Sequence, residues 1–302
     1  MNLIFVGDVF IIVTSLIVLV AASITDIKKR EVANWLVFSF LAVMLALRVL
    51  IWILTGSWTY FVYALIYGVV AFIIASLLYY GKALGGADAK LLIGLACAFA
   101  TAPSFLNFNY GIYLLGISSF FTKNLFIFDF IVNCLFVGLV YSLVYSFVLA
   151  FLNKERFVKT FSEISKEKKT LRIVFLVLGL VLLVMAFYNQ INQMLLVLGV
   201  FVLIFPYLYI FVRSVENSCL IKMKSWKELT EGDWLVKSVK INKKIINPSA
   251  DGLSKEDISL IKKSGKKVLI KDGLPFVPVF LISLIVSLLL GNLLIRILEI
   301  LV

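Results

Sequence analysis

The sequence contains no histidine, and this absence removes several classes of catalytic site. Ser-His-Asp and Cys-His systems need an imidazole as the base, and HExxH metalloproteases need it as a zinc ligand. The three cysteines, Cys97, Cys134 and Cys219, are scattered with no CxxC spacing, so they indicate neither a disulfide framework nor a zinc knuckle. No phosphate-binding loop is evident. We therefore expect no metal and no cofactor.

Charged residues are also scarce. They make up 15% of the 302 residues, whereas hydrophobic residues make up 62% and the mean hydropathy is +1.07. A soluble domain has about 25% charged and about 45–50% apolar residues. The composition therefore predicts an all-α polytopic membrane protein, in which the bilayer covers most of the apolar surface.

Eight apolar runs predict the membrane spans, and a count of six or seven is also possible. Most runs reach the roughly 20 residues that a helix needs to cross the hydrocarbon core. Residues 104–121 are interrupted by asparagines and glycines, so we interpret them as a re-entrant or surface piece. The eight runs lie at residues 3–24, 32–54, 58–80, 88–103, 126–152, 171–188, 194–212 and 275–298.

The basic residues predict the orientation, because cytoplasmic loops of membrane proteins are enriched in Lys and Arg. With the N-terminus outside, 26 of the 29 basic residues fall in four inner loops, and the other three are Arg48, Lys123 and Arg296. Basic loops near anionic headgroups explain the net charge of +12 without a nucleic-acid partner. The four inner loops are residues 25–31, 81–90, 153–172 and 213–272.

The last inner loop predicts a small cytoplasmic α/β segment. Residues 234–241 and 267–270 are candidate strands, because their apolar residues alternate or cluster over a short run. Ser254 opens a capping box for a short helix that ends near Gly265. We therefore predict three parts of the chain: a transmembrane core at 1–212, a basic α/β segment at 213–272 and a C-terminal transmembrane helix at 273–302.

Two aspartates lie where an apolar run meets a short polar segment. A carboxylate costs roughly 2.5–3.5 kcal/mol at the bilayer centre on insertion scales, so an acid in a membrane segment is a candidate functional site. Small residues flank both Asp26 and Asp88, and small residues let membrane helices approach closely. Both aspartates fall at the same predicted membrane face. We therefore interpret them as the dyad of an aspartyl protease.

Each aspartate also has a simpler explanation. Asp26 could merely end a helix beside three basic residues, and Asp88 could stabilise a helix N-terminus through the helix dipole. Neither explanation accounts for the two glycines before Asp88. Lys90 points roughly 200° away from Asp88 on a helix, so we expect it to reach the headgroups. The other acids of the spans are expected at outer ends, in contact with water: Asp8, Asp129 and Glu299.

The hexamer Gly85-Gly86-Ala87-Asp88-Ala89-Lys90 resembles the signature of the GxGD membrane aspartyl proteases, in particular the archaeal type IV prepilin and preflagellin peptidases. The stretch from Thr25 to Trp35 is similar to the family's first-aspartate region, with Ala33 where proline is frequent. Ala87 stands where bacterial members have glycine. The tail is similar at Glu231-Gly232-Asp233-Trp234, Gly252-Leu253-Ser254 and Gly273-Leu274-Pro275-Phe276-Val277-Pro278.

The resemblance implies an endopeptidase that removes the short basic leader from type IV pilin-like or archaellin precursors at the cytoplasmic face of the cell membrane. It makes Asp26 and Asp88 the catalytic pair, in which one acid holds a proton while the other activates water. The paired-cysteine segment of bacterial members is missing, so methyl transfer is not expected. Substrate-binding or motif-supporting residues are Gly85, Gly86, Ala87 and Lys90.

Two other classes of function stay open on the sequence alone. An ion- or proton-coupled transporter could use Asp26 and Asp88 as a relay, although the repeated halves typical of transporters are not evident. A non-catalytic membrane scaffold for a pilus or secretion machine is the other class. Precursor cleavage, ion flux that depends on the aspartates, or neither would distinguish the three.

Overall fold

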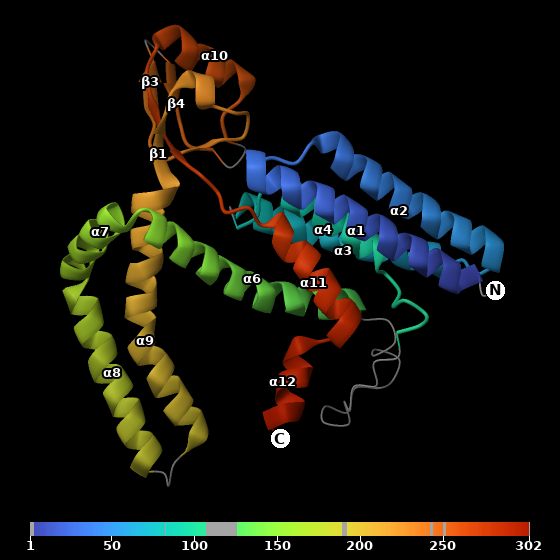
Figure 1. The fold of residues 1–302 in the computed structure, drawn as a ribbon, viewed down its shortest axis with the longest axis horizontal. Coiled ribbons are helices and arrows are strands. Elements are labelled where there is room, and N and C mark those ends of the chain that lie inside the picture. Colours follow the sequence, from blue (N-terminus) through green and yellow to red (C-terminus); the bar gives the residue numbers. More distant parts are fainter. Residues whose placement is uncertain are drawn as a thin grey trace. The chain divides into compact units, whose positions relative to one another are not determined.

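The computed structural model describes residues 3–81, 83–106, 126–188, 192–241, 244–249 and 252–301. Its contacts divide the chain into two units (Figure 1). The first unit is Met1–Ser142 with Gly273–Val302, and the second unit is Leu143–Asp272. The three-part division at 212/213 and 272/273 stays a prediction.

Among the described residues, six helices are long and apolar enough to cross a membrane. A helix of 22 residues, the length of α2 and α3, is about 33 Å long, which covers the hydrocarbon core of about 30 Å. The all-α polytopic membrane fold is therefore confirmed, with a small sheet region. The six helices are α1 (Leu3–Lys29), α2 (Asn34–Thr55), α3 (Thr59–Tyr80), α6 (Phe126–Leu152), α8 (Lys169–Tyr188) and α9 (Gln193–Val215), which continues as a π-helical turn to Leu220.

Two of the eight predicted spans are not long single helices. The run 88–103 forms α4 (Gly86–Ala98), which has 13 residues. The run 275–298 is divided into α11 (Val277–Leu290) and α12 (Leu293–Leu301). At 14 residues, α11 is about 21 Å long, too short to cross the hydrocarbon core by itself. The piece at 104–121 lies largely outside the described residues.

The break between α11 and α12 follows from two residues inside the apolar run. Gly291 adopts φ 71° and ψ −134°, a backbone conformation that essentially requires glycine. The side-chain oxygen of Asn292 then accepts the backbone N–H groups of Leu294 and Ile295 at 3.0 and 3.3 Å, which caps the new helix. Hydropathy predicted one span because these two polar positions hardly change the average over the run.

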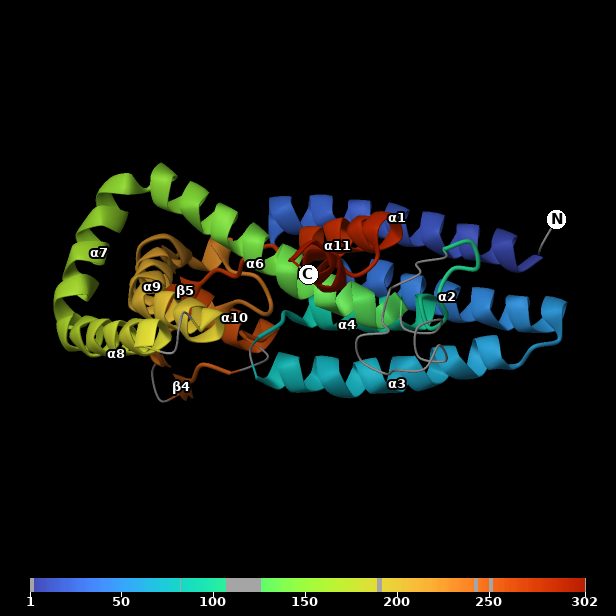
Figure 2. The same cartoon turned by 90° about the horizontal axis from the view of Figure 1, so that it is seen from below.

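In the first unit, α4 contacts α1, α2 and α3, while α11 packs against α1. Figure 2 shows the first four helices side by side. The close approach depends on glycine: a Cβ at Gly94 of α4 would lie 2.7 Å from the ring of Phe40 on α2, and a Cβ at Gly68 of α3 would lie 2.7 Å from Cys97 Sγ on α4. Small residues thus bring the helices of this unit together, as expected for packing in lipid.

The aspartates expected in contact with water at the outer ends are instead buried in the first unit. Asp8 is 4% exposed and accepts the backbone N–H of Ser104 at 2.7 Å. Asp129 is 8% exposed and accepts a hydrogen bond from the side chain of Asn292 at 2.8 Å. Membrane segments can bury an ionisable group where a hydrogen-bond partner offsets the cost of burial. The expectation that Asp8 and Asp129 contact water was therefore wrong. The side chain of Glu299 lies outside the described part.

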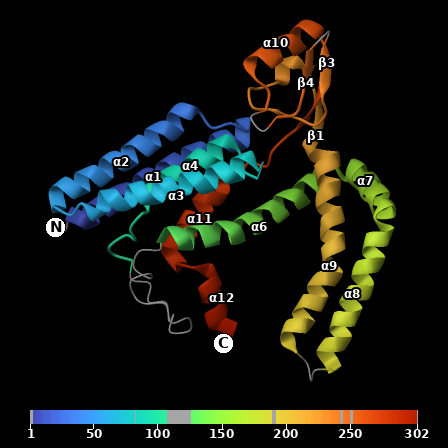
Figure 3. The same cartoon turned by 180° about the vertical axis from the view of Figure 1, so that it is seen from behind.

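In the second unit, α8 and α9 form a helical hairpin and lie side by side (Figure 3). A Cβ at Gly179 would meet the side chain of Leu203 at 2.6 Å, and one at Gly199 would meet Leu183 at 2.9 Å. The predicted inner loop 153–172 contains an amphipathic helix, α7 (Lys154–Glu167), that packs against α9.

The small α/β part of the second unit contains a helix and five strands among its described residues. Ser254 caps α10 (Lys255–Ser264) by accepting the N–H of Asp257 at 3.1 Å, and Gly265 ends it at φ 65°, as predicted. The candidate strand 267–270 is confirmed as β5. The candidate 234–241 is divided between two sheets, because the chain bends after Leu235. The strands are β1 (Ile221–Lys224), β2 (Trp234–Leu235) and β5 (Val268–Lys271) in the antiparallel order β1-β5-β2, and β3 (Val239–Ile241) with β4 (Lys244–Ile246) in an antiparallel pair.

Candidate aspartate site

Asp26 belongs to a stripe of buried residues along α1. The residues of this stripe recur every three or four positions, which places them on one face of the helix. Asp26, in the last turns of α1, is 9% exposed. The helix periodicity therefore turns its carboxylate into the protein. The stripe consists of Asp8, Ile11, Ser15, Leu19, Ala22 and Asp26.

The carboxylate of Asp26 contacts the beginning of α11. Its Oδ2 accepts the backbone N–H of Val277 at 3.1 Å, across 251 positions of sequence. Val277 is the first residue of α11, and the first N–H groups of a helix have no partner within the helix. A negative charge is also favoured at this end of the helix dipole. Asp26 thus joins α1 to α11. The contact gives the buried carboxylate a hydrogen-bond donor and gives the first N–H of α11 an acceptor.

Asp88 is half-buried and lies in the first turn of α4. Its Oδ2 accepts the backbone N–H of Gly85 at 3.2 Å, which is the acidic half of a capping box. A Cβ at Gly85 would lie 2.9 Å from this oxygen, so the missing side chain makes room for the carboxylate. A Cβ at Gly86 would lie 3.4 Å from the Tyr79 ring, an ordinary contact. Gly85 is therefore the glycine that the geometry needs.

The structure brings the two aspartates to the same end of the first unit. Asp26 is near the end of α1, and Asp88 is near the beginning of α4, which packs against α1. The two carboxylates interact electrostatically. Two neighbouring carboxylates cannot both ionise without a large cost, so such a pair tends to share one proton. This arrangement offers a proton acceptor and a proton donor at the same end of the first unit.

Two further residues of the motif stretches meet each other. Lys90 Nζ donates to Asn34 Oδ1 at 2.8 Å and lies 5.0 Å from the ring centroid of Phe38. Both partners lie in α2, so Lys90 attaches α4 to α2, where we had expected it to reach the headgroups. Ala87 packs against the core of the first unit.

Sequence reasoning missed two participants of the site, Val277 and Arg30. Arg30 Nη1 donates a hydrogen bond to the carbonyl of Gly273, and this bond joins the end of α1 to the segment before α11. The sequence did contain a signal, because the Gly273–Pro278 hexamer resembles the family's tail and precedes an apolar run. A helix start supplies unpaired N–H groups that a buried aspartate needs.

One hydroxyl near Asp26 has no hydrogen-bond partner among the described residues. Ser23 lies one turn before Asp26 in α1, and it is 5% exposed. Leaving a buried hydroxyl unpaired costs about 1–3 kcal/mol, so a partner that arrives with a substrate or a water would be favourable.

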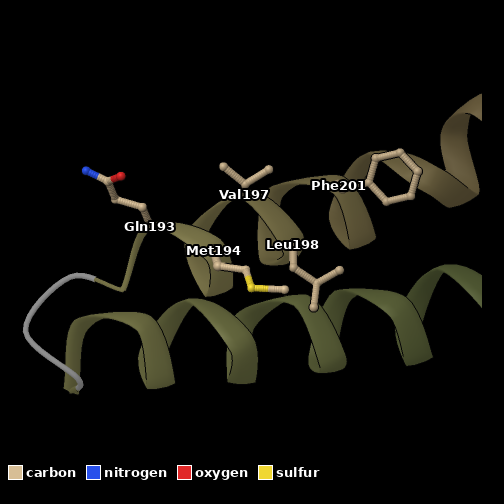
Figure 4. A pocket seen from close by; sticks show the side chains of 5 residues that line it. All are labelled: Gln193, Met194, Val197, Leu198 and Phe201. Atoms are coloured by element: carbon tan, nitrogen blue, oxygen red, sulfur yellow. The ribbon is translucent and has the colours of Figure 1, made fainter. Parts of the chain in front are cut away.

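Two other kinds of site receive no support in the described part of the chain. A pocket on α9 is lined by side chains that do not ionise, so it offers neither an acid nor a base (Figure 4). Among all the described residues, no group of three His, Cys, Asp or Glu side chains lies close enough together to hold a metal ion. The pocket residues are Gln193, Met194, Val197, Leu198 and Phe201.

Comparison with known proteins gives one match. Residues 13–152 match the model of the type IV leader peptidase family, and this range contains both aspartates and the Gly85–Lys90 hexamer. The match confirms the resemblance to prepilin peptidases that the motifs indicated. Searches of curated proteins and of solved structures returned no match to this chain.

Proposed function

Residues 13–152 match the type IV leader peptidase family, and from this match we propose that the chain is an aspartyl endopeptidase with Asp26 and Asp88 as its catalytic pair. A prepilin-type peptidase role follows from the family itself. The aspartic mechanism is supported by one observation above all: Asp26 and Asp88, from distant stretches of sequence, lie at the same end of the first unit, where their charges interact.

The reaction needs no group beyond the two acids and a water. The ionised carboxylate takes a proton from the water, whose oxygen attacks the carbonyl carbon of the scissile peptide bond. The protonated carboxylate donates a hydrogen bond to the carbonyl oxygen as negative charge develops there. Collapse of the tetrahedral intermediate transfers a proton to the leaving amine and breaks the C–N bond. Either aspartate can start as the base.

Main-chain groups and an unpaired hydroxyl complete the site in this proposal. The N–H groups of Val277 and Gly85 hold one oxygen of Asp26 and of Asp88, respectively. The backbone of Phe276 also interacts with the Asp26 carboxylate. The hydroxyl of Ser23 offers a hydrogen bond to the attacking water or to the substrate backbone.

The substrate class follows from the family and from the charge of the site. Pilin-like precursors carry a short basic leader before an apolar helical segment, and the apolar segment would lie along the membrane helices. The ionised carboxylate of the pair attracts the leader locally. We assign the cleavage to the cytoplasmic membrane face, because basic residues concentrate in the loops on the side of Asp26. Archaellin precursors are an alternative substrate of the same chemistry, and membrane lipids would surround both.

The test is cleavage of a purified pilin-like precursor by the reconstituted protein, followed by mass spectrometry. The wild-type protein should release the leader, whereas Asp26→Asn and Asp88→Asn should each lower the rate by more than about 1,000-fold. The double variant should be hardly slower than either single variant, because the two acids act as one unit.

Glu155→Gln in α7 is the matched control and should cleave at the wild-type rate, since Glu155 is exposed. Asp8 and Asp129 are unsuitable controls because both are buried and hydrogen-bonded. Normal cleavage by Asp26→Asn would show that the wrong carboxylates are paired. Ion flux that depends on Asp26 and Asp88, without cleavage, would favour the transporter.

A further inference from the structure

Two hydrogen bonds attach the end of α1 to the beginning of α11. The N–H of Val277 donates to Asp26 Oδ2 at 3.1 Å, and Arg30 donates to the carbonyl of Gly273. Asp26 and Arg30 are four residues apart, and so are Val277 and Gly273, in the opposite direction along the chain. The two segments are therefore held at two points, with the carboxylate of Asp26 at one of them.

The backbone of Arg30 is in a costly conformation. Its φ of 58° is left-handed, and in the described part of the chain Arg30 is the sole residue other than glycine with a positive φ. Its N–H donates to the carbonyl of Asp26 at 2.9 Å, so Arg30 ends α1 where a glycine commonly ends a helix. A left-handed conformation costs a residue with a Cβ about 1–2 kcal/mol. Such local strain points to a role for the side chain.

Stability alone does not explain this arginine. The Arg30 side chain is exposed, and an exposed polar contact contributes little to the free energy of unfolding. Its guanidinium, however, also interacts favourably with the charge of Asp26. The side chain thus acts on the carboxylate in two ways, through space and through the segment that donates to it.

We propose that Arg30 and the segment Gly273–Val277 form a clamp that positions Asp26 for catalysis. Arg30 fixes Gly273, the short segment carries this restraint to Val277, and the N–H of Val277 holds Oδ2 of Asp26. We assign the other carboxylate oxygen, Oδ1, to the reaction with the water and Asp88. Arg30 is a positioning residue, since it acts through Asp26 and Val277. The inference rests on the proposed function.

The experiment compares Arg30→Gly, Arg30→Lys and the control Lys29→Ala in cleavage of a pilin-like precursor. Arg30→Gly removes the clamp while relieving the left-handed backbone, so the thermal unfolding temperature should stay the same or rise. We expect kcat to fall about 10- to 100-fold, since small misplacement of a catalytic group has effects of this size, while KM changes little. Arg30→Lys keeps a charged donor and should recover most of kcat. Lys29→Ala should match the wild type.

Three kinetic outcomes would overturn the clamp: wild-type kcat in Arg30→Gly, a change confined to KM, or an Arg30→Lys variant as slow as Arg30→Gly. A change confined to KM would mean that Arg30 contacts the leader instead.

A measurement without substrate separates this proposal from the proposed function. Hydrogen exchange of the wild-type protein and of Arg30→Gly reports on the backbone N–H of Val277 directly. Faster exchange at residues 276–279 in Arg30→Gly supports the clamp even if no precursor is cleaved. Unchanged exchange there rules the clamp out, whether or not the protein is a peptidase.

Discussion

At the scale of single residues, burial of a carboxylate is not by itself a sign of catalysis in this chain. Asp8, Asp26, Asp88 and Asp129 each accept a hydrogen bond from a backbone N–H or a side-chain amide. Each of these bonds holds a loop or a helix end in place. Asp26 and Asp88 differ from the other two because they interact with each other. Pairing, and not burial, identifies the site.

A carboxylate outside the membrane helices allows a pH prediction. Burial of Asp272 disfavours its charged form, but hydrogen bonds and charges from Lys224 and Lys222 outweigh this effect, so the pKa of Asp272 lies below its usual 3.8. The N–O distances are 2.9 Å to Lys224 and 3.3 Å to Lys222. A carboxylate whose pKa is lowered by folding stabilises the folded state above its unfolded pKa, and the stabilisation is lost as pH falls through the folded pKa.

Asp272→Asn should therefore lower the free energy of unfolding by about 1 kcal/mol at pH 7, near the upper end for such pairs. The difference from the wild type should shrink as the pH falls below about 4 and through the lowered pKa of folded Asp272, because the wild-type carboxylate then also becomes neutral. Thermal unfolding of the purified full chain at several pH values measures this. Glu231→Gln is the control, because the Glu231–Lys255 pair is exposed and should contribute little. A difference that does not change with pH would contradict the assignment.

The sequence predicted the two aspartates but not the groups that hold them. Asp26 and Asp88 stand out because an acid at the edge of an apolar run is costly, and this cost is visible in a local window. Val277 contacts Asp26 across 251 positions of sequence, and it does so through its backbone N–H. Almost every residue type has this group, so the residue type at position 277 does not reveal the contact. Only the packing of α11 against α1 selects that N–H. Gly85 is part of the sequence motif. The reason that a glycine is needed there is that a side chain would collide with Oδ2 of Asp88, and the sequence alone does not show this contact.

At the scale of elements, local signals fixed some boundaries and distant residues fixed others. Helix α10 was predicted because Ser254 and Gly265 act within their own turns. By contrast, α4 ends at Ala98, although the apolar run predicted from the sequence extends to residue 103. Arg48 of α2, 1% exposed, donates to the carbonyls of Cys97 and Ala98 at this end. These carbonyls have no partner within a helix that stops there, so a residue of another helix satisfies this end of α4.

Arg48→Met tests this role, because methionine keeps most of the apolar length and removes the donors. Arg48 also donates to Thr101 Oγ1 at 2.7 Å, so several buried acceptors would lose their partner. We expect the free energy of unfolding to fall by at least about 1–3 kcal/mol, measured by thermal or denaturant unfolding in one detergent. Adding Asp8→Asn should cost less in this background than in the wild type, since the charges of Asp8 and Arg48 interact. A neutral Arg48→Met variant would show that α4 ends for another reason.

At the scale of the whole molecule, the distribution of charge predicts which face carries the site. Helices α1 to α4 are joined by short connections, so the end of α1 and the beginning of α4 lie on one side, and the connection between α2 and α3 lies on the other. The first two connections on the aspartate side are basic. Arg48, Lys123 and Arg296 are the basic residues that the predicted topology does not place in an inner loop. The proposed cytoplasmic location of the dyad rests on this asymmetry.

Cysteine labelling of intact cells tests the orientation. The native Cys97, Cys134 and Cys219 are buried and can be replaced by alanine to give a background without thiols. A membrane-impermeant maleimide added from outside should label Ser57→Cys, in the connection between α2 and α3, and should not label Lys29→Cys or Lys240→Cys. Permeabilised cells should label all three positions, which controls for access. Lys29 lies in the last turn of α1, close in sequence to Asp26, so its label reports the face of the dyad directly. If position 29 is labelled from outside, the dyad lies at the outer face, where a cytoplasmic leader could not reach it. If position 240 is labelled from outside, the basic α/β part does not lie on the predicted inner side.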